Sequence, residues 1–197
     1  VADLLVREGV ATPDVALEAA RAAQSHIGLA RALARDPQMR ERRRAIITAP
    51  ASVRSVGEAV MAADRLLETA KAQADAQVSE RNAREKAELM RQLGMDEGES
   101  ATKASRTMIR QLEEDQKRRS KRALTDAIDR ALIDLLAIYR DVLMVQVGGD
   151  GELINTDLSD LVHEIAQDST RRPTLARVDH IETARTRLES NGHPLLV

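Results

Sequence analysis

The sequence contains no cysteine, tryptophan or phenylalanine, and Tyr139 is its only aromatic residue. Without cysteine, a disulfide scaffold, a thiol enzyme and a thiolate zinc site are excluded. The shortage of aromatic and β-branched residues argues against an all-β or parallel α/β domain, because such cores are built from them. Proline is missing from residues 51–172, and no apolar run approaches the ~18 residues of a membrane span. The remaining class is an all-helical intracellular protein.

The charge is nearly balanced, with 30 Lys and Arg against 32 Asp and Glu, so the chain as a whole does not attract nucleic acid. Residues 1–5 have no initial Met and no signal-peptide pattern, and residues 193–197 form an apolar run. We therefore expect a fragment cut from a longer cytoplasmic protein that has no membrane partner.

Two very long helices are the main structural prediction. Ser55 and Glu58 have the spacing of a capping box, which marks a helix start. Residues 58–93 and 99–147 each contain neither Gly nor Pro, and the glycine-rich stretch 94–100 separates them. We expect an antiparallel hairpin whose arm covers about residues 71–123.

The arm has a narrow apolar seam, which is typical of a coiled coil rather than of a buried helix. The residues expected in it are Val78, Leu89, Met90 and Leu93 on one helix, and Met108, Ile109 and Leu112 on the other. The base of the second helix, by contrast, has a wide apolar face around Tyr139, where we expect this side chain to be buried.

No catalytic set can be assembled from the sequence. The four histidines, His26, His163, His180 and His193, are isolated, and none has a second histidine at metal-binding spacing. We therefore expect no enzyme activity, no cofactor and no metal in this chain.

Two basic clusters carry the strongest local charge: residues 40–44, and a second cluster on the arm. They could contact DNA phosphates, or they could be a solvated helix surface or a protein interface. Acidic residues one turn before the arm cluster, and the lack of aromatic residues for base stacking, weigh against DNA. The arm cluster consists of Lys117, Arg118, Arg119, Lys121 and Arg122.

Several segments, in their order and spacing, resemble one family: the delta-prime subunit of the bacterial DNA polymerase III clamp loader, in its actinobacterial form. Residues 20–36 (ARAAQSHIGLARALARD) resemble lid helices of its ATPase-like module. The second resemblance is residues 112–119 (LEEDQKRR), which lead into 127–135 (AIDRALIDL) and 139–143 (YRDVL). Residues 185–194 (RTRLESNGHP) resemble the closing helix of the collar.

The resemblance implies an all-α fold in which a lid remnant, residues 1–37, precedes a helical collar domain, residues 38–197. The function implied is a non-catalytic clamp-loader subunit for DNA replication, which mediates oligomerisation of the loader that places the sliding clamp on DNA. Its partners would be the delta subunit and the gamma/tau ATPase subunits, with the clamp and primer-template DNA reached through the complex. The arm, which a plain collar does not need, would dock another replication protein or DNA.

The resemblance also assigns interface and sensor positions. Gly28 aligns with the sensor arginine of ATP-using relatives, which fits a subunit that does not hydrolyse ATP, whereas a shifted alignment makes Arg31 the candidate. Both alignments stay open. The apolar residues expected to form core and subunit contacts are Leu132, Leu135, Leu136, Tyr139, Leu158, Leu161, Ile181 and Leu188.

The alternative is a free-standing coiled-coil adaptor protein that dimerises through the hairpin arm. It predicts a homodimer through the seam at Leu89, Leu93, Met108 and Leu112, whereas the collar interpretation predicts a fragment that is monomeric alone.

Overall fold

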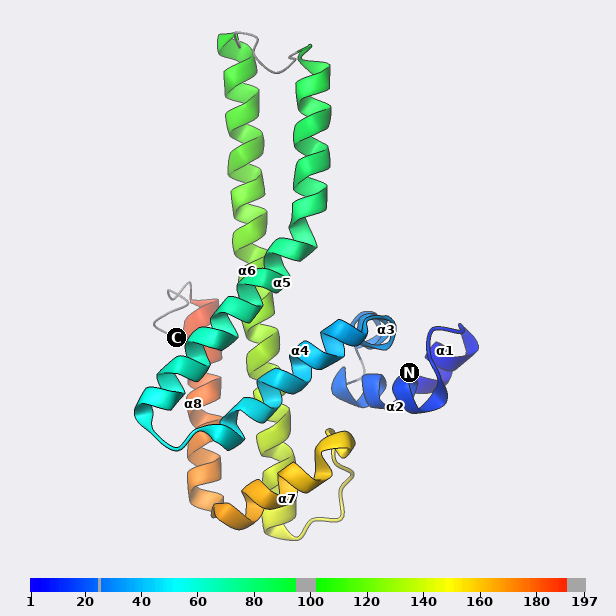
Figure 1. Ribbon diagram of the computed structural model, residues 1–197, viewed down its shortest axis with the longest axis vertical. Helices are drawn as coiled ribbons and strands as arrows, with labels where there is room; N and C mark the ends of the chain where they lie inside the picture. The colour runs from blue at the N-terminus through cyan, green and yellow to red at the C-terminus, as the bar shows by residue number, and fades with distance from the viewer. Residues whose placement is uncertain (25, 95–101, 191–197) are drawn as a thin grey trace. The chain divides into compact units, whose positions relative to one another are not determined.

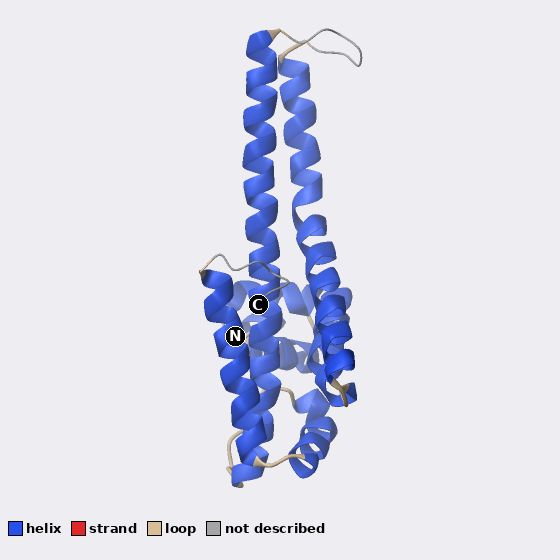
Figure 2. Cartoon of the chain, turned by 90° about the vertical axis from the view of Figure 1, so that its left-hand side faces the viewer, coloured by secondary structure: helices blue, strands red, loops and turns tan. Residues whose placement is uncertain are grey.

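The computed structural model describes residues 1–24, 26–94 and 102–190, and these residues form helices without any strand (Figures 1 and 2). The expected all-α fold is confirmed. The helices, in chain order, are α1 (Ala2–Arg7), α2 (Pro13–Ala22), α3 (Ile27–Arg35), α4 (Pro37–Thr48), the 3₁₀ turn η1 (Ala49–Ser52), α5 (Val56–Gln92), α6 (Lys103–Val147), the 3₁₀ turn η2 (Thr156–Leu158), α7 (Ser159–Asp168) and α8 (Arg171–Glu189).

The predicted start of α5 is confirmed in detail. The backbone N–H of Glu58 donates to the Ser55 hydroxyl at 3.2 Å, and the backbone N–H of Ser55 donates to the Glu58 carboxylate at 3.0 Å. This reciprocal pair satisfies two backbone donors that a helix start would otherwise leave unpaired.

Glycine ends α6 where the sequence indicates. Gly148 has φ +68°, a left-handed conformation that residues with a side chain rarely adopt, and its N–H donates to the Val145 carbonyl at 3.1 Å. The predicted turn at 94–100 lies outside the described residues apart from Gly94. The predicted C-cap at Asn191 and Gly192 lies outside them entirely.

The chain divides into two compact units. The first combines Val1–Leu66 with Arg130–Val197, and the second is Leu67–Asp129. Helices α5 and α6 each contribute to both units, so the long helices are continuous in sequence while their packing partners change along them. The division into residues 1–37 and 38–197 stays a prediction.

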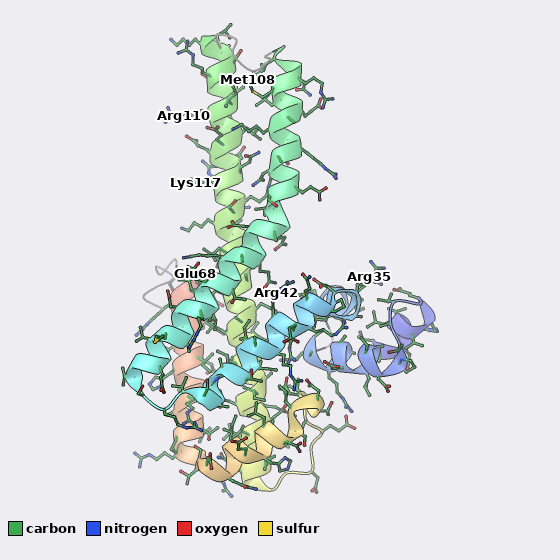
Figure 3. All side chains as sticks on the ribbon, in the orientation of Figure 1. Arg35, Arg42, Glu68, Met108, Arg110 and Lys117 are labelled. Carbon is green, nitrogen blue, oxygen red and sulfur yellow. The ribbon has the colours of Figure 1, made fainter. Side chains whose placement is uncertain are left out.

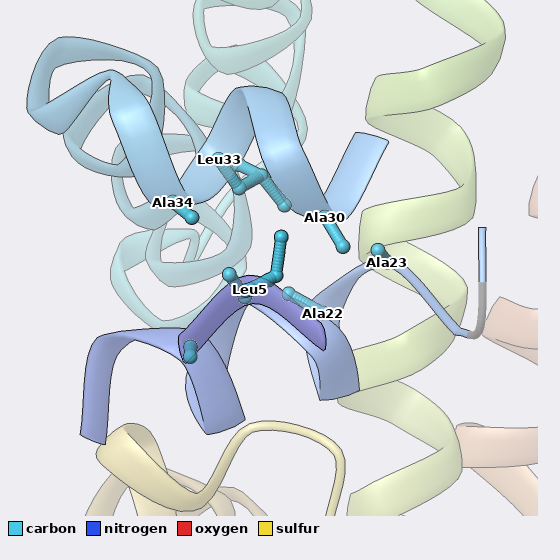
Figure 4. Close-up of a cluster of buried hydrophobic side chains, with 8 residues drawn as sticks. Leu5, Ala22, Ala23, Ala30, Leu33 and Ala34 are labelled. Carbon is cyan, nitrogen blue, oxygen red and sulfur yellow. The ribbon is translucent and has the colours of Figure 1, made fainter. Parts of the chain in front are cut away.

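Two hydrophobic clusters lie among the described residues of the first unit. In one, Leu5 of α1 packs among small residues of α2 and α3 (Figure 4). Most of the buried residues in this cluster are alanines, and small side chains let the helices approach one another closely. The other cluster joins α4, α6 and the C-terminal helices, with the fully buried Ile47, Ile138, Val142 and Val162 at its centre.

The second unit is an antiparallel pair formed by the adjoining parts of α5 and α6, which run side by side in both views (Figures 1 and 2). In one of its clusters, the buried Ala74 and Val78 of α5 pack with Ala123 and Leu124 of α6. Leu67 and Ala70 of α5 and Ala127 and Ile128 of α6 are also buried. The predicted seam residues Leu89, Met90, Leu93, Ile109 and Leu112 are half-buried.

Met108 was expected in the seam, and the structure corrects this prediction. Its side chain is 49% exposed. Ser105, three residues earlier, is the buried residue of this turn, and its hydroxyl lies 2.8 Å from that of Thr102. At this turn of α6 the buried side chain is therefore a small hydroxyl residue, whereas the apolar pattern suggested methionine.

Candidate partner-binding surfaces and the buried polar network

A buried carboxylate, Asp141, fastens α6 to the loop that follows it. Its side chain is 0% exposed. It accepts hydrogen bonds from the backbone N–H groups of Ile154 at 3.0 Å and Asn155 at 2.8 Å, and from the Asn155 side-chain amide at 2.9 Å. The Arg140 guanidinium donates to it at 2.8 Å. Because a buried charge is tolerated only when it is paired, this loop and this helix depend on each other.

A buried arginine, Arg43, extends the same network to α4. Its Nε donates to the Asp134 carboxylate at 3.2 Å, and another of its N–H groups donates to the side-chain oxygen of Asn155. Arg130 also donates to Asp134, at 2.9 Å. Asn155 thus lies between the buried arginine and Asp141, and the network joins α4, α6 and the loop before η2.

The arginines of the basic cluster at residues 40–44 are all bonded to groups of the chain itself, although Arg44 stays exposed. In each case the arginine is the donor, and Arg43 is only 8% exposed. Sequence reasoning could not distinguish this from phosphate contact, because both uses require the same side chain. The other partners are the Leu33 and Ala34 carbonyls for Arg40 at 2.6 and 3.1 Å, Asp36 for Arg42 at 3.2 Å, and Asp157 for Arg44 at 3.1 Å.

Three of the predicted subunit-interface residues lie inside the chain itself. Tyr139, Leu158 and Leu188 are buried, which confirms the expected burial of Tyr139 but removes all three from the accessible surface. Arg177 lies over the Tyr139 ring, 5.7 Å from its centroid. Leu132, Leu135, Leu136, Leu161 and Ile181 are half-buried, with Leu161 and Ile181 packed against the cluster around Ile138.

The start of α5 carries the most exposed apolar side chains in the described part of the chain. Val56 is 83% exposed, and Val60 and Met61 are also exposed. Val56 and Val60 continue the apolar stripe that becomes buried from Leu67 onward, at spacings of three and four residues. Hydrophobic periodicity identified this stripe but could not reveal that its first two turns have no cover among the described residues.

The five residues of the arm cluster do not act as one group. Lys117, Arg118, Lys121 and Arg122 are exposed, whereas Arg119 is half-buried. The Arg119 guanidinium donates to the Asn82 side-chain oxygen at 2.7 Å and to the Glu85 carboxylate at 2.8 Å, both on α5. Arg119 therefore differs from its expected role at a partner surface, because it ties the two helices of the hairpin together.

The cross-helix pair has an electrostatic consequence. Hydrogen bonds from Arg119 and then from Arg81 lower the pKa of Glu85 from 4.5 to about 2. A carboxyl whose pKa is depressed in the folded state favours that state above its unfolded pKa and loses this contribution as the pH falls toward 2. Glu85 consequently keeps its charge, and its bond to Arg119, throughout the neutral and mildly acidic range.

The three histidines in the described part of the chain take capping or surface positions. His26 accepts a hydrogen bond from the Leu29 backbone N–H at 3.1 Å, and His163 Nδ1 lies 2.7 Å from the Ser159 carbonyl oxygen. His180 is exposed, and His193 lies outside the described residues. Within residues 1–24, 26–94 and 102–190 no group of three His, Asp or Glu side chains is arranged to hold a metal. No helix among them is both long and apolar enough to cross a membrane.

A pocket of about 310 Å³ lies in the first unit, between α2, α3 and α4. Its lining includes Arg40, Arg43 and Arg44, which already hydrogen-bond to other groups of the chain. Glu18, Glu41 and Asp157 add three carboxylates to the lining, so the pocket presents balanced charge. This arrangement favours a packing gap between helices over a site for a charged ligand.

The two sensor candidates occupy different environments. The Arg31 guanidinium forms a two-pronged ion pair with Glu8 of the α1 C-cap, at 2.8 to 3.1 Å. Gly28 lies in the first turn of α3, where an added Cβ would approach the His26 ring to 3.3 Å. Ser25, the first residue of the sensor-like motif, lies outside the described residues.

Comparison of the chain with protein-family models, with curated proteins and with solved structures gave no significant match.

Proposed function

We propose that this chain is a non-catalytic assembly module of a clamp-loader subunit of the delta-prime type. It would act in DNA replication by holding loader subunits together through its helices. The delta subunit and the gamma/tau ATPase subunits would be its direct partners, and the sliding clamp and primer-template DNA would be reached through the complex. A cytoplasmic location, and activity without a cofactor of its own, belong to the same proposal.

The observation that carries the proposal is that the buried charged residues bond to one another. Arg43, Asp134 and Asp141 are the buried charged residues of the described chain, and all three hydrogen-bond within one network that joins helices. A catalytic acid or base must be free to form a hydrogen bond with the substrate. A network whose members bind one another supports a rigid helical scaffold.

The segments that resemble the family supply a second line of support. Residues 20–36 include the end of α2 and all of α3, and residues 112–143 lie within α6. Arg31, the alternative sensor arginine, is engaged by Glu8, which favours a module that does not contact nucleotide. The exposed apolar side chains at the start of α5 are available for contact with another subunit.

The oligomeric state of the isolated chain distinguishes the two candidate functions. A clamp-loader module without its partners is expected to be a monomer of 21.7 kDa. An adaptor that dimerises through the hairpin would have twice that mass, yet Leu89, Leu93 and Leu112 are already half-buried within one chain. We predict a monomeric mass by multi-angle light scattering at 10 to 100 μM. A dimer that dissociates when Leu89 and Leu112 are changed to Ser would favour the adaptor instead.

A further inference from the structure

Positive charge is concentrated on one helix of the second unit. Residues 103–122 of α6 contain eight Lys and Arg against three Asp and Glu, a net charge of +5. The facing part of α5, residues 67–92, contains five of each and is neutral. The hairpin is therefore electrostatically one-sided, although the chain as a whole carries a net charge of −2.

The excess charge follows one face of α6. Lys103, Arg110 and Lys117 recur at seven-residue intervals and Lys121 comes four residues later, so at 3.6 residues per turn they form one line. This line is about 27 Å long at 1.5 Å per residue. All four side chains are exposed, and Arg110 and Lys117 extend from the side of α6 away from α5 (Figure 3). We call this line, with the neighbouring Arg118 and Arg122, the basic face.

Most of the basic face is not neutralised by the protein. Lys103, Lys117, Lys121 and Arg122 make no side-chain hydrogen bond or ion pair with the described residues. Two acidic residues pair with the remaining members of the face: Glu114 with Arg110 at 3.3 Å, and Asp115 with Arg118 at 3.7 Å. The cations of α5 differ, since Lys71, Arg84 and Arg91 each pair with an acid one turn away on the same helix.

The character of this face favours a phosphate backbone over a protein partner or a single strand. A protein interface needs an apolar centre, and the exposed large apolar residue on this part of α6, Met108, lies more than 100° around the helix from the line through Lys117. Single-stranded binding uses aromatic stacking, and the chain's single aromatic residue, Tyr139, is buried in the other unit. A row of exposed cations, of which Lys103, Lys117 and Lys121 are unpaired and Arg110 is paired with Glu114, suits the continuous negative charge of a duplex backbone.

We infer that the basic face of α6 binds the phosphate backbone of duplex DNA without sequence preference. The contact is independent of the proposed assembly role, because it needs only this chain and a duplex. It would add an attachment point for DNA on the hairpin, separate from whatever DNA path a complete loader provides.

The test uses the whole chain and a fluorescein-labelled 30-base-pair duplex, titrated at 50, 100 and 200 mM NaCl. One variant combines Lys117→Gln, Lys121→Gln and Arg122→Gln. The control combines Lys71→Gln, Arg84→Gln and Arg91→Gln, which removes the same charge from α5. All six side chains project from exposed helix surface, and circular dichroism checks that the helix content of both variants is unchanged.

The expected result is salt-dependent binding that the first variant weakens by about tenfold at 50 mM NaCl. Its slope of log K against log salt should fall by about 2 to 3, because each lost phosphate contact removes about 0.9. The control should bind within twofold of the unchanged protein. The inference is overturned if the duplex does not bind at 50 mM NaCl, or if both variants lose affinity equally. It is also overturned if poly-glutamate binds the basic face more tightly than the duplex, which would indicate an acidic protein partner.

Discussion

Replacing Asp141 with alanine is expected to lower the free energy of unfolding by about 3–5 kcal/mol, the cost of removing one member of a buried charged network. The substitution leaves the backbone N–H groups of Ile154 and Asn155 without an acceptor, and it removes the carboxylate that holds the Asn155 side-chain amide, whose oxygen accepts from Arg43. Since a typical domain has only 5–15 kcal/mol of stability, this loss should unfold the first unit at moderate urea concentration.

Urea denaturation followed by circular dichroism measures the change. The matched control is Asp150→Ala, in the loop after α6, where the side chain is exposed and the expected change is within about 0.5 kcal/mol. A loss for Asp141→Ala that equals the loss for Asp150→Ala would show that the loop is not held by this carboxylate.

Replacing Ile138 with alanine is expected to cost about 2–5 kcal/mol, the range for truncating a large apolar side chain in a packed core. Ile138 is 0% exposed and lies in the cluster that brings α4, α6 and α7 together. The Ile138 side chain has no polar atom, so its truncation removes no hydrogen bond and the loss of stability measures packing alone. The loss for Asp141→Ala measures instead the contribution of a buried carboxylate and its hydrogen bonds.

The control for packing is the same substitution at Ile27, which is 46% exposed at the start of α3. Here the loss should stay below about 1 kcal/mol, because little apolar surface returns to water. Equal losses at the two isoleucines would mean that the cluster around Ile138 does not hold the first unit together. Thermal unfolding monitored at 222 nm provides an independent reading of both variants.

Local signals in the sequence were sufficient to predict the helices. The capping box at Ser55 and Glu58, the glycine after α6 and the proline-free interval all act within a few residues of the backbone they control. Hydrophobic periodicity likewise predicted the burial of Tyr139, because this residue lies on an apolar face of α6 that is wide enough to pack against a core.

Partner choice could not be predicted in the same way. Arg43, Arg119 and Lys117 all lie in basic runs, yet the first is buried, the second binds Glu85 across the hairpin and the third is exposed. The difference depends on which residue of a distant helix lies opposite. Val56 shows the converse, since its stripe is apolar but no described element covers it.

Surface charge illustrates a related limit. The net charge of −2 and the near balance of the whole chain concealed the one-sided distribution on the hairpin, because helix orientation decides which charges point outward. The structure separates neutralised cations from unpaired ones, because it shows which acid lies beside which cation. Glu85 pairs with Arg119, Glu113 with Lys86 and Asp115 with Arg118.

Reconstitution tests the proposed assembly role most directly. The protein that carries this chain would be co-expressed with the delta subunit and the gamma/tau ATPase subunits of the same organism, and the purified complex weighed by native mass spectrometry. The account predicts one copy of the protein in a five-subunit complex, and loss of that complex when Asp141→Ala unfolds the first unit. A chain that stays apart from the loader subunits, or that enters only as its own homodimer, would contradict it.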